Sequence, residues 1–254
     1  MKKFLAIALA ALLVVCMIGC SKDEAPEIEN DDSTTSEELV KDNFKYAVNE
    51  DGDYEIVGYI TSGDTAFDVT LPTEIDGRPV TGIGATAFKA LKVRTITIPE
   101  GYTYIAQCAF WNCTDLTEIT LPNTITEIGK SAFNGCSNLT KVTFSSSLKT
   151  IDDGAFAYCE KLSGVVLPES LTTIGLGAFM DCDAIDSIII PKNVVSIGKG
   201  AFVNCKTLLN VEFHEEARTN WYDEAGNSVN VSNKSDAAIL FGNGTKLVRV
   251  VPEN

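Results

Sequence analysis

The triplet Gly129-Lys130-Ser131 has the form in which a phosphate-binding loop ends. In such a loop, backbone N–H groups and the lysine surround phosphate oxygens, and a second glycine stands five positions before the Gly-Lys pair. Thr124 occupies that position. The same slot recurs later in the chain as Gly198-Lys199-Gly200, where no serine follows the lysine. We therefore interpret the triplet as a recurring turn and exclude a nucleotide site.

His214 is the single histidine of the chain, so multi-histidine metal sites are excluded and any Ser/His or Cys/His catalysis would run through it. The pair His214-Glu215 begins like a zinc protease motif, but Arg218 stands where the second histidine is needed. Acidic residues are numerous, yet no pair recurs in a recognisable frame. We assign residues 49–53, NEDGD, to a hairpin turn and not to a calcium loop. The sequence predicts no catalytic residue, no metal and no cofactor.

Five of the eight cysteines recur at a spacing of 23 residues: Cys113, Cys136, Cys159, Cys182 and Cys205. Zinc would need paired C-x-x-C spacing, which the chain lacks. We interpret these cysteines as a column of buried thiols, each packing as a small hydrophobe. Cys108 lies outside the column, and a bond between it and Cys113 is left open as an alternative.

The first 19 residues have the features of an export signal. Two lysines precede an apolar run of 15 residues, which is short for a membrane span. The run leads into Met17-Ile18-Gly19-Cys20, which resembles a bacterial lipobox, whose cysteine is acylated and becomes the first residue. We predict residues 1–19 to be a lipoprotein signal peptide and Cys20 to be the lipid attachment site. The alternative is an ordinary secretory signal cleaved nearby.

Residues 20–41 are acidic and polar, with almost nothing to bury, and predict a disordered tether behind the lipidated cysteine. The opening Ser21-Lys22-Asp23-Glu24 resembles the signal that sends Bacteroidetes lipoproteins to the outer face of the outer membrane. We expect a membrane-anchored lipoprotein at the cell surface, touching the membrane through its acyl anchor alone. The net charge of −15 makes nucleic acid an unfavourable partner, and we expect a monomer.

The remainder of the chain repeats itself. Phenylalanine preceded by alanine recurs at spacings of 22, 23, 23, 23 and 23, at Phe88, Phe110, Phe133, Phe156, Phe179 and Phe202. Other apolar residues recur at fixed offsets between these positions, and a fixed period in the twenties is typical of a solenoid. Each coil is too small to bury its own apolar face, so we expect every recurring offset to form a column inside a stack.

Within each repeat, an Ile-x-Leu pair has the period of two expected of a short strand, and the proline that follows ends it. The Gly-x-x-Ala-Phe-x-x-Cys part predicts a tight turn or one helical turn with phenylalanine pointing inward. We place the solenoid at residues 68–213. Residues 42–67 predict a capping β-hairpin around Asp51-Gly52, and residues 214–254 predict a C-terminal cap of short strands.

The repeat C-x-x-L-x-x-I-x-L-P-x-x-[LIV]-x-x-I-G-x-x-A-F-x-x-C resembles the BspA-like leucine-rich repeats of bacterial surface proteins. The resemblance implies a leucine-rich-repeat solenoid of mostly short β-strands, with turns or short helical segments and β caps at both ends. It also implies adhesion, since BspA-like proteins are associated with binding host matrix proteins such as fibronectin and fibrinogen, and with bacterial co-aggregation.

One row of residues lies between the two inward strand positions and is expected to point outward: Thr97, Thr120, Thr143, Val166 and Ile189. Tyr102, Tyr104 and Trp111 of one coil add a candidate aromatic contact patch. The alternative for the row is strand propensity alone. We expect a non-enzymatic surface lipoprotein that binds extracellular or host proteins. The alternative is a glycan-binding accessory lipoprotein of a nutrient-uptake system, with Trp111 and the tyrosines as sugar platforms.

Overall fold

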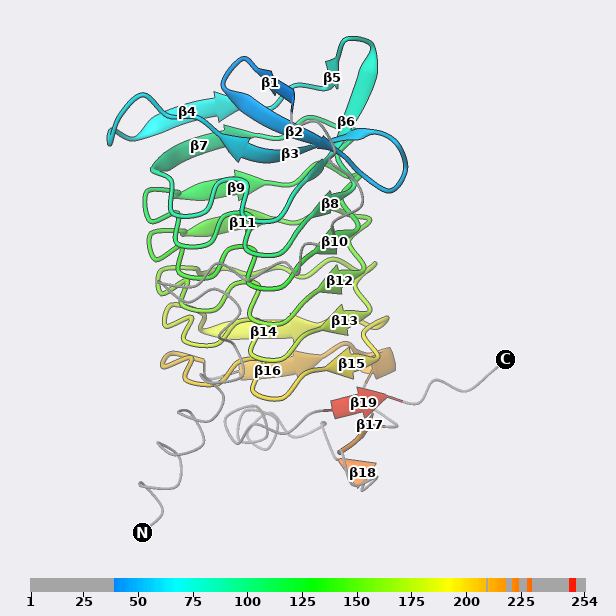
Figure 1. The fold of residues 1–254 in the computed structure, drawn as a ribbon. Coiled ribbons are helices and arrows are strands. Elements are labelled where there is room, and N and C mark those ends of the chain that lie inside the picture. Colours follow the sequence, from blue (N-terminus) through cyan, green and yellow to red (C-terminus); the bar gives the residue numbers. More distant parts are fainter. Residues whose placement is uncertain (1–38, 209, 218–220, 224–227, 230–246, 250–254) are drawn as a thin grey trace, which may run out of the picture.

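The structure is a computed structural model that describes residues 39–208, 210–217, 221–223, 228–229 and 247–249. These residues form a stack of coils in which each repeat makes one turn of a β-solenoid (Figure 1). The predicted leucine-rich-repeat solenoid is therefore confirmed. The signal peptide, Cys20 and most of the tether lie outside the described residues. Among the described residues, none belongs to a helix with the length and apolarity needed to cross a membrane.

Within the ranges that the structure describes, thirteen strands along one side of the stack form a single sheet. In sheet order they are β1 (Leu39–Lys41), β2 (Phe44–Val48), β3 (Tyr54–Tyr59), β6 (Arg78–Ile83), β8 (Tyr104–Ile105), β10 (Glu127–Ile128), β12 (Thr150–Ile151), β13 (Thr173–Ile174), β15 (Ser196–Ile197), β19 (Leu247–Arg249), β17 (Trp221–Tyr222) and β18 (Ser228–Val229), with β5 (Glu74–Ile75) paired to β6. From β3 to β15 neighbouring strands are parallel, which is the consequence of one coil following another.

A second side carries three pairs of parallel strands from the Ile-x-Leu segments. These are β4 (Phe67–Thr70) with β7 (Val93–Thr97), β9 (Glu118–Thr120) with β11 (Lys141–Thr143), and β14 (Ser187–Ile190) with β16 (Asn210–Phe213). Pairing joins residues one repeat apart, such as Ile119 with Val142. Because the register equals the sequence period, identical offsets stack on one another and form columns.

The Ala-Phe segments are tight turns, which settles the choice between a turn and a helical turn. The N–H of Phe110 donates to the carbonyl of Ala132 in the next coil at 2.7 Å, and bonds between residues three apart, such as that from the N–H of Cys113 to the carbonyl of Phe110 at 3.1 Å, close each turn. Each turn contains a left-handed residue, as at Ser131 with a φ of 53°. Within the described ranges, the one helical segment is a 3₁₀ turn at Glu215–Ala217.

The core is a continuous column of stacked rings. Successive phenylalanines from Phe88 to Phe202 have ring centroids 5.1 to 5.4 Å apart and planes within 8° of parallel. Their rings are buried, as are the alanines before them. Parallel rings whose centroids lie this far apart attract one another, and the spacing between coils sets this separation at each step.

β1–β3 lie at the N-terminal end of the stack (Figure 1). β2 and β3 pair antiparallel around Asp51-Gly52, and β3 pairs parallel with β6, which joins the hairpin to the first coil. β1, Leu39–Lys41, pairs with β2. These three residues therefore belong to the sheet and not to the tether predicted to extend to residue 41. The physical reason is that the hairpin leaves an edge of unpaired backbone groups, which β1 satisfies.

At the C-terminal end, β19 pairs antiparallel with β15 and with β17, which pairs in turn with β18. The indole of Trp221 packs edge-on against Phe213, with centroids 5.3 Å apart, and Trp221 is buried. Of the cap predicted over residues 214–254, residues 218–220, 224–227, 230–246 and 250–254 lie outside the described residues.

Candidate functional site

The outward strand row consists of exposed residues between buried neighbours. In β14 the exposed positions alternate with the buried Ile188 and Ile190, as the period of two requires. The threonines of the row are all exposed, as are Val166 and Ile189. Val166 and Ile189 are 78% and 59% exposed as whole residues, so this part of the row is apolar and open to solvent.

Strand pairing places members of the row side by side across the coils. Thr70 pairs with Thr97, Thr120 with Thr143, and Ile189 with the half-buried Glu212. The structure thus extends the row by one coil, to Thr70, which the sequence reasoning missed because it began the row at Thr97. We call the row from Thr70 to Ile189 the outward strand face.

The coil of Val166 departs from its neighbours. Residues 164–167 form no strand, and Gly164 is left-handed with a φ of 58°. A Cβ placed on this exposed glycine would meet nothing within 4 Å. The flanking positions in the adjacent coils are Lys141 and Ser187. The absence of a side chain at Gly164 leaves the side of Val166 open, which accounts for its high exposure.

At the other end of the outward strand face, β7 and β9 border a shallow groove lined by Thr95, Thr97, Glu118, Thr120 and Pro122, among others. The groove is chemically mixed, with threonine hydroxyls, the two carboxylates of Glu100 and Glu118, and the edges of buried isoleucines. Sequence reasoning missed it, because a groove between coils depends on side-chain lengths in both strands.

The predicted aromatic patch is wrong for Tyr102, which is buried. Its hydroxyl donates to the carbonyl of Pro72 at 2.7 Å, and burial raises its pKa. Tyr102 belongs to an inward column at the repeat period, continued by Ile125, Leu148, Leu171 and Val194, all of them buried. The spacing of 23 residues between Tyr102 and Ile125 was the signal that could have placed this ring inside.

The other two aromatic residues of that coil have different neighbours. Tyr104 is half-buried, and its hydroxyl donates to Oε2 of Glu55 at 2.7 Å. Burial and this carboxylate raise the pKa of Tyr104. Trp111 is half-buried with the ammonium of Lys89 over its ring, 5.0 Å from the centroid. The structure therefore does not bring the three rings together as one contact surface.

The thiols of the cysteine column are largely buried and hydrogen-bonded, which makes them unreactive. Each thiol donates to the carbonyl of a phenylalanine in the preceding coil at 3.0 to 3.2 Å. Burial raises the pKa of Cys113 and Cys205 to about 12, and that of the three thiols between them well above the ordinary range. A buried neutral thiol is a poor nucleophile and a poor ligand. Cys113 is a free thiol, so it does not bond to Cys108.

The described part of the chain shows no catalytic arrangement at His214. This half-buried residue accepts a long hydrogen bond, 3.3 Å, at Nδ1 from the N–H of Glu216. Across the described ranges, no group of three or more His, Cys, Asp or Glu residues converges on a position where a metal ion could bind.

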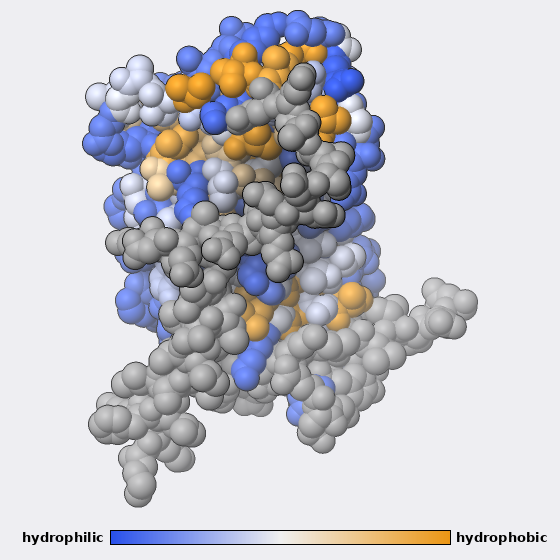
Figure 2. All heavy atoms as spheres, in the orientation of Figure 1, coloured by the Kyte–Doolittle hydropathy of each residue, from blue (hydrophilic) through white to orange (hydrophobic). Residues whose placement is uncertain are grey.

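Apolar surface also gathers at the N-terminal end of the molecule. Figure 2 shows orange atoms over the region of β1–β4, whereas the visible rim of the coils is largely hydrophilic. The exposed apolar residues of this region are Val40, Val48 and Ile60. Among the described residues, the large exposed apolar side chains thus fall into two groups, one at the N-terminal strands and one at Val166 and Ile189.

The stacked coils, the two sets of short parallel strands and the recurring apolar columns define a leucine-rich-repeat β-solenoid. Residues 81–217 match the family model described as "BspA type Leucine rich repeat region", in six copies. Because this match covers more than half of the 254 residues, the chain belongs to that family. Members of this repeat class are typically non-enzymatic modules that bind proteins. Among curated proteins, none matches the chain.

Solved structures of bacterial leucine-rich repeat proteins are similar. A leucine-rich repeat protein of T. pallidum is 31% identical, with 68% of this chain and 70% of that chain covered and a TM-score of 0.50. One from Bacteroides ovatus is 29% identical, with 68% and 40% covered and a TM-score of 0.53. A leucine rich cell surface protein of Faecalibacterium prausnitzii is 26% identical, with 80% and 62% covered and a TM-score of 0.62. The chain thus spans less than two thirds of the latter two proteins.

Proposed function

We propose that this protein is a cell-surface lipoprotein that acts as a non-enzymatic binding or adhesion module and presents its outward strand face to an extracellular or host protein. The observation that carries the proposal is the exposure of Val166 and Ile189 in consecutive coils. Single exposed apolar residues are common on soluble proteins and need no explanation. Two large ones at the same repeat position of consecutive coils form a patch, and apolar patches rimmed by polar residues mark contact sites.

The surroundings of the patch suit a protein partner. Thr143, Lys141 and Ser187 supply polar groups around Val166 and Ile189, which resembles the polar rim and apolar centre of an interface. The row is built from β-branched side chains with few rotamers, on a backbone held from below by the stacked core. A surface of this kind loses little conformational entropy on binding, which favours affinity.

The membrane anchor rests on the lipobox at Met17–Cys20. Each buried CH₂ of an acyl chain contributes about 0.8 kcal/mol to membrane binding, so two or three chains on Cys20 hold the protein firmly. The acidic segment behind Cys20 would let the solenoid reach away from the membrane. The proposed location is the outer leaflet of the outer membrane. Cys20→Ala should release the protein from membranes, and continued tight association would contradict lipidation.

The binding proposal is tested with the purified full chain on immobilised fibronectin, fibrinogen and a panel of other matrix proteins. The double variant Val166→Thr/Ile189→Thr keeps β-branching and the backbone but removes the apolar patch. We expect it to lose at least tenfold in affinity for the partner that wild type binds. Val40→Thr, at an exposed valine of β1 outside the outward strand face, is the matched control and should bind as wild type does. Unchanged binding by the double variant would overturn the proposal.

The alternative is a glycan-binding accessory lipoprotein that uses Trp111, Tyr102 and Tyr104 as sugar platforms, and it has less support. Tyr102 is inside the core, and Tyr104 is engaged by Glu55. Trp111 remains as a candidate platform, with Lys89 lying over its ring. Glycan binding that Trp111→Ala abolishes, together with no binding to any matrix protein, would favour this alternative over adhesion.

A further inference from the structure

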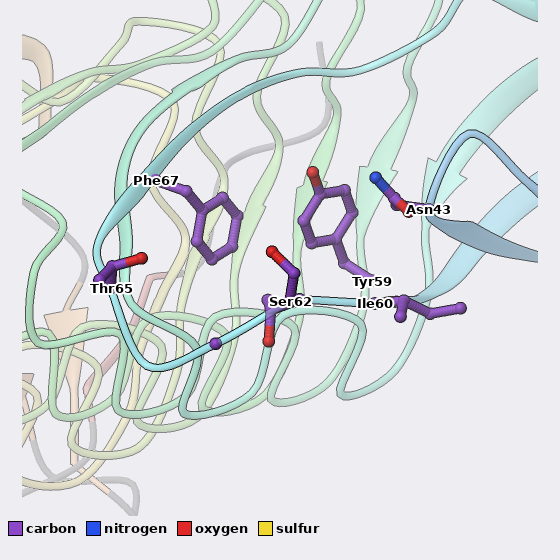
Figure 3. Close-up of a pocket in the computed structure, with 8 residues that line it drawn as sticks. Asn43, Tyr59, Ile60, Ser62, Thr65 and Phe67 are labelled. Atoms are coloured by element: carbon purple, nitrogen blue, oxygen red, sulfur yellow. The ribbon is translucent and has the colours of Figure 1, made fainter.

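A pocket of about 170 Å³ lies at the N-terminal end of the molecule, between the β1–β2 turn and the segment that links β3 to β4. Its wall is formed by two aromatic rings and four small polar residues (Figure 3): Tyr59, Phe67, Asn43, Thr61, Ser62 and Thr65. No residue of the outward strand face lines it, so the pocket is separate from the proposed protein-binding surface.

The aromatic wall is rigid because it continues the central ring column. Tyr59 stacks on Phe88 with centroids 5.8 Å apart, and Phe67 stacks on Tyr59 at 5.1 Å with planes 17° from parallel. The ring of Phe44 meets Tyr59 edge-on at 4.9 Å. Phe67 therefore stands at the end of a buried stack, is itself half-buried, and presents a fixed aromatic surface to the pocket.

The polar wall is positioned by the backbone. Asn43 is left-handed, with a φ of 68°, and its carbonyl accepts the N–H of Ile60 at 2.8 Å. This bond ties the β1–β2 turn to the start of the linking segment. In Figure 3 the amide nitrogen of Asn43 points toward Tyr59, and the hydroxyls of Ser62 and Thr65 lie beside the two rings, whereas Ile60 points away.

Charge at the pocket selects the class of ligand. The lining residues carry no formal charge. Asp64, in the same linking segment, is 93% exposed and forms an ion pair with Nζ of Lys92 at 2.9 Å. The chain as a whole is acidic, with a net charge of −15. The acidic chain disfavours anions, and the lining offers no carboxylate to pair with a cation, which favours a neutral ligand that combines an apolar face with several hydroxyl groups.

We propose that this pocket binds one neutral pyranose ring, such as the terminal residue of a glycan. The C–H face of a pyranose packs on an aromatic ring, and its hydroxyls exchange hydrogen bonds with small hydroxyl and amide side chains. Pockets for drug-sized ligands occupy about 300–1,000 Å³, so this smaller pocket admits a single ring. The inference goes beyond the proposed protein-binding function, and neither depends on the other.

The test is saturation-transfer NMR on the full chain with glucose, galactose and N-acetylglucosamine as separate probes. We expect transfer to the ring C–H protons of at least one sugar. The double variant Ser62→Ala/Thr65→Val removes two hydroxyls at exposed positions and should weaken that binding about tenfold, since each hydrogen bond contributes modestly. Thr114→Val removes an exposed hydroxyl of a coil turn outside both the pocket and the outward strand face, and should leave sugar binding unchanged.

Two results would overturn the proposal. One is the absence of transfer to all three sugars at millimolar concentration. The other is transfer that is equally strong in wild type and in Ser62→Ala/Thr65→Val. Failure of this experiment leaves matrix-protein binding through Val166 and Ile189 untouched, and loss of matrix binding in the Val166→Thr/Ile189→Thr variant leaves the sugar signal unchanged.

Discussion

The thiol of Cys136 donates a hydrogen bond to the backbone carbonyl of Phe110 in the preceding coil, with Sγ and O 3.2 Å apart. The same carbonyl also accepts the N–H of Cys113 at 3.1 Å. The bond from thiol to carbonyl recurs at Cys159, Cys182 and Cys205, so the cysteine and phenylalanine columns are joined by a ladder of hydrogen bonds. A short side chain with a weak donor suits the position, since alanine would leave a void there and a longer side chain would not fit.

The first prediction concerns alkaline pH. An unfolded thiol has a pKa of about 8.5, whereas the folded pKa of Cys159 is raised well above the ordinary range by burial. The folded state therefore keeps the proton longer. The stabilisation is complete below about pH 8.5 and is lost as pH rises toward the folded pKa, at about 1.4 kcal/mol per pH unit for each thiol. Urea unfolding under reducing conditions between pH 8 and 10 measures this loss.

The control for this prediction is Cys159→Ser, which keeps a donor for the carbonyl of Phe133 but does not titrate in this range. The variant should lose about 1.4 kcal/mol per pH unit less than wild type above pH 9. If the two stability curves ran parallel up to pH 10, the buried neutral thiol would not be the source of the alkaline loss.

The solenoid was predictable because its signal is redundant. The Ala-Phe pairs, the cysteines and the isoleucine columns all repeat with one period, and a register of one repeat is the arrangement that stacks all of them. The alternation around Thr120 likewise placed the outward strand face, because a strand has two sides and its buried neighbours fix which one faces out.

Three other features were not predicted from the sequence: the left-handed turn residues, the burial of Tyr102 and the pocket beside Phe67. The sequence pattern alone does not explain why glycine, serine or cysteine precedes Ala-Phe, whereas the structure shows that Cys108 and Ser131 share a left-handed backbone there, with φ of 55° and 53°. Glycine is the residue that suits this conformation best, and it occupies the slot in the later coils. Tyr102 was misplaced because its residue type indicated a surface, although its spacing indicated the core. The pocket beside Phe67 lies outside the repeat, where no period reports on contacts.

The second prediction concerns the ring column. Phe156 is buried and stacks between Phe133 and Phe179 at 5.1 and 5.4 Å, with Phe144 edge-on at 5.6 Å. Phe156→Ala should lower the free energy of unfolding by about 3–5 kcal/mol, because it removes buried surface and leaves a cavity that coil-to-coil bonds keep open. Urea unfolding followed by circular dichroism measures the free energy of unfolding.

Val166→Ala, at an exposed position, should stay within about 0.5 kcal/mol of wild type. A Phe156→Ala variant that melts like wild type would show that the column is not the core.

The third prediction concerns the glycine after the inward isoleucine. A Cβ on Gly175 would lie 2.4 Å from the carbonyl carbon of Asp152 and the nitrogen of Asp153. These are backbone atoms, and the N–H of Gly175 is bonded to the carbonyl of Ile151 at 2.7 Å, so the coils cannot separate locally without losing that bond. Gly175→Ala should therefore cost about 1–3 kcal/mol, the usual range for overpacking.

Gly63→Ala is the matched control for this prediction, because its Cβ would meet nothing within 4 Å. This variant should be neutral or slightly more stable, since alanine restricts the unfolded chain. Thermal melting of both variants decides the matter. Equal melting temperatures for Gly175→Ala and Gly63→Ala would mean that close approach between coils does not explain the recurring glycine.

The fourth prediction concerns acid pH at the edge of the outward strand face. The guanidinium of Arg94 donates to both carboxylate oxygens of Asp68, and the hydroxyl of Thr95 donates to Oδ1 at 2.6 Å. The bonds from Arg94, followed by that from Thr95, lower the pKa of Asp68 to about 2. Because the folded pKa is depressed, this carboxylate contributes stability above the unfolded pKa of about 3.9, and the contribution is lost as pH falls through about 2.

Arg94→Gln should raise the pKa of Asp68 toward its ordinary value, as measured by carboxyl-carbon NMR titration. Arg78→Gln removes a cation that lies over the ring of Tyr54 and should leave the pKa of Asp68 where it is. If the pKa of Asp68 stayed near 2 in Arg94→Gln, the hydrogen bond from Thr95, and not the guanidinium of Arg94, would be the main cause of the low value.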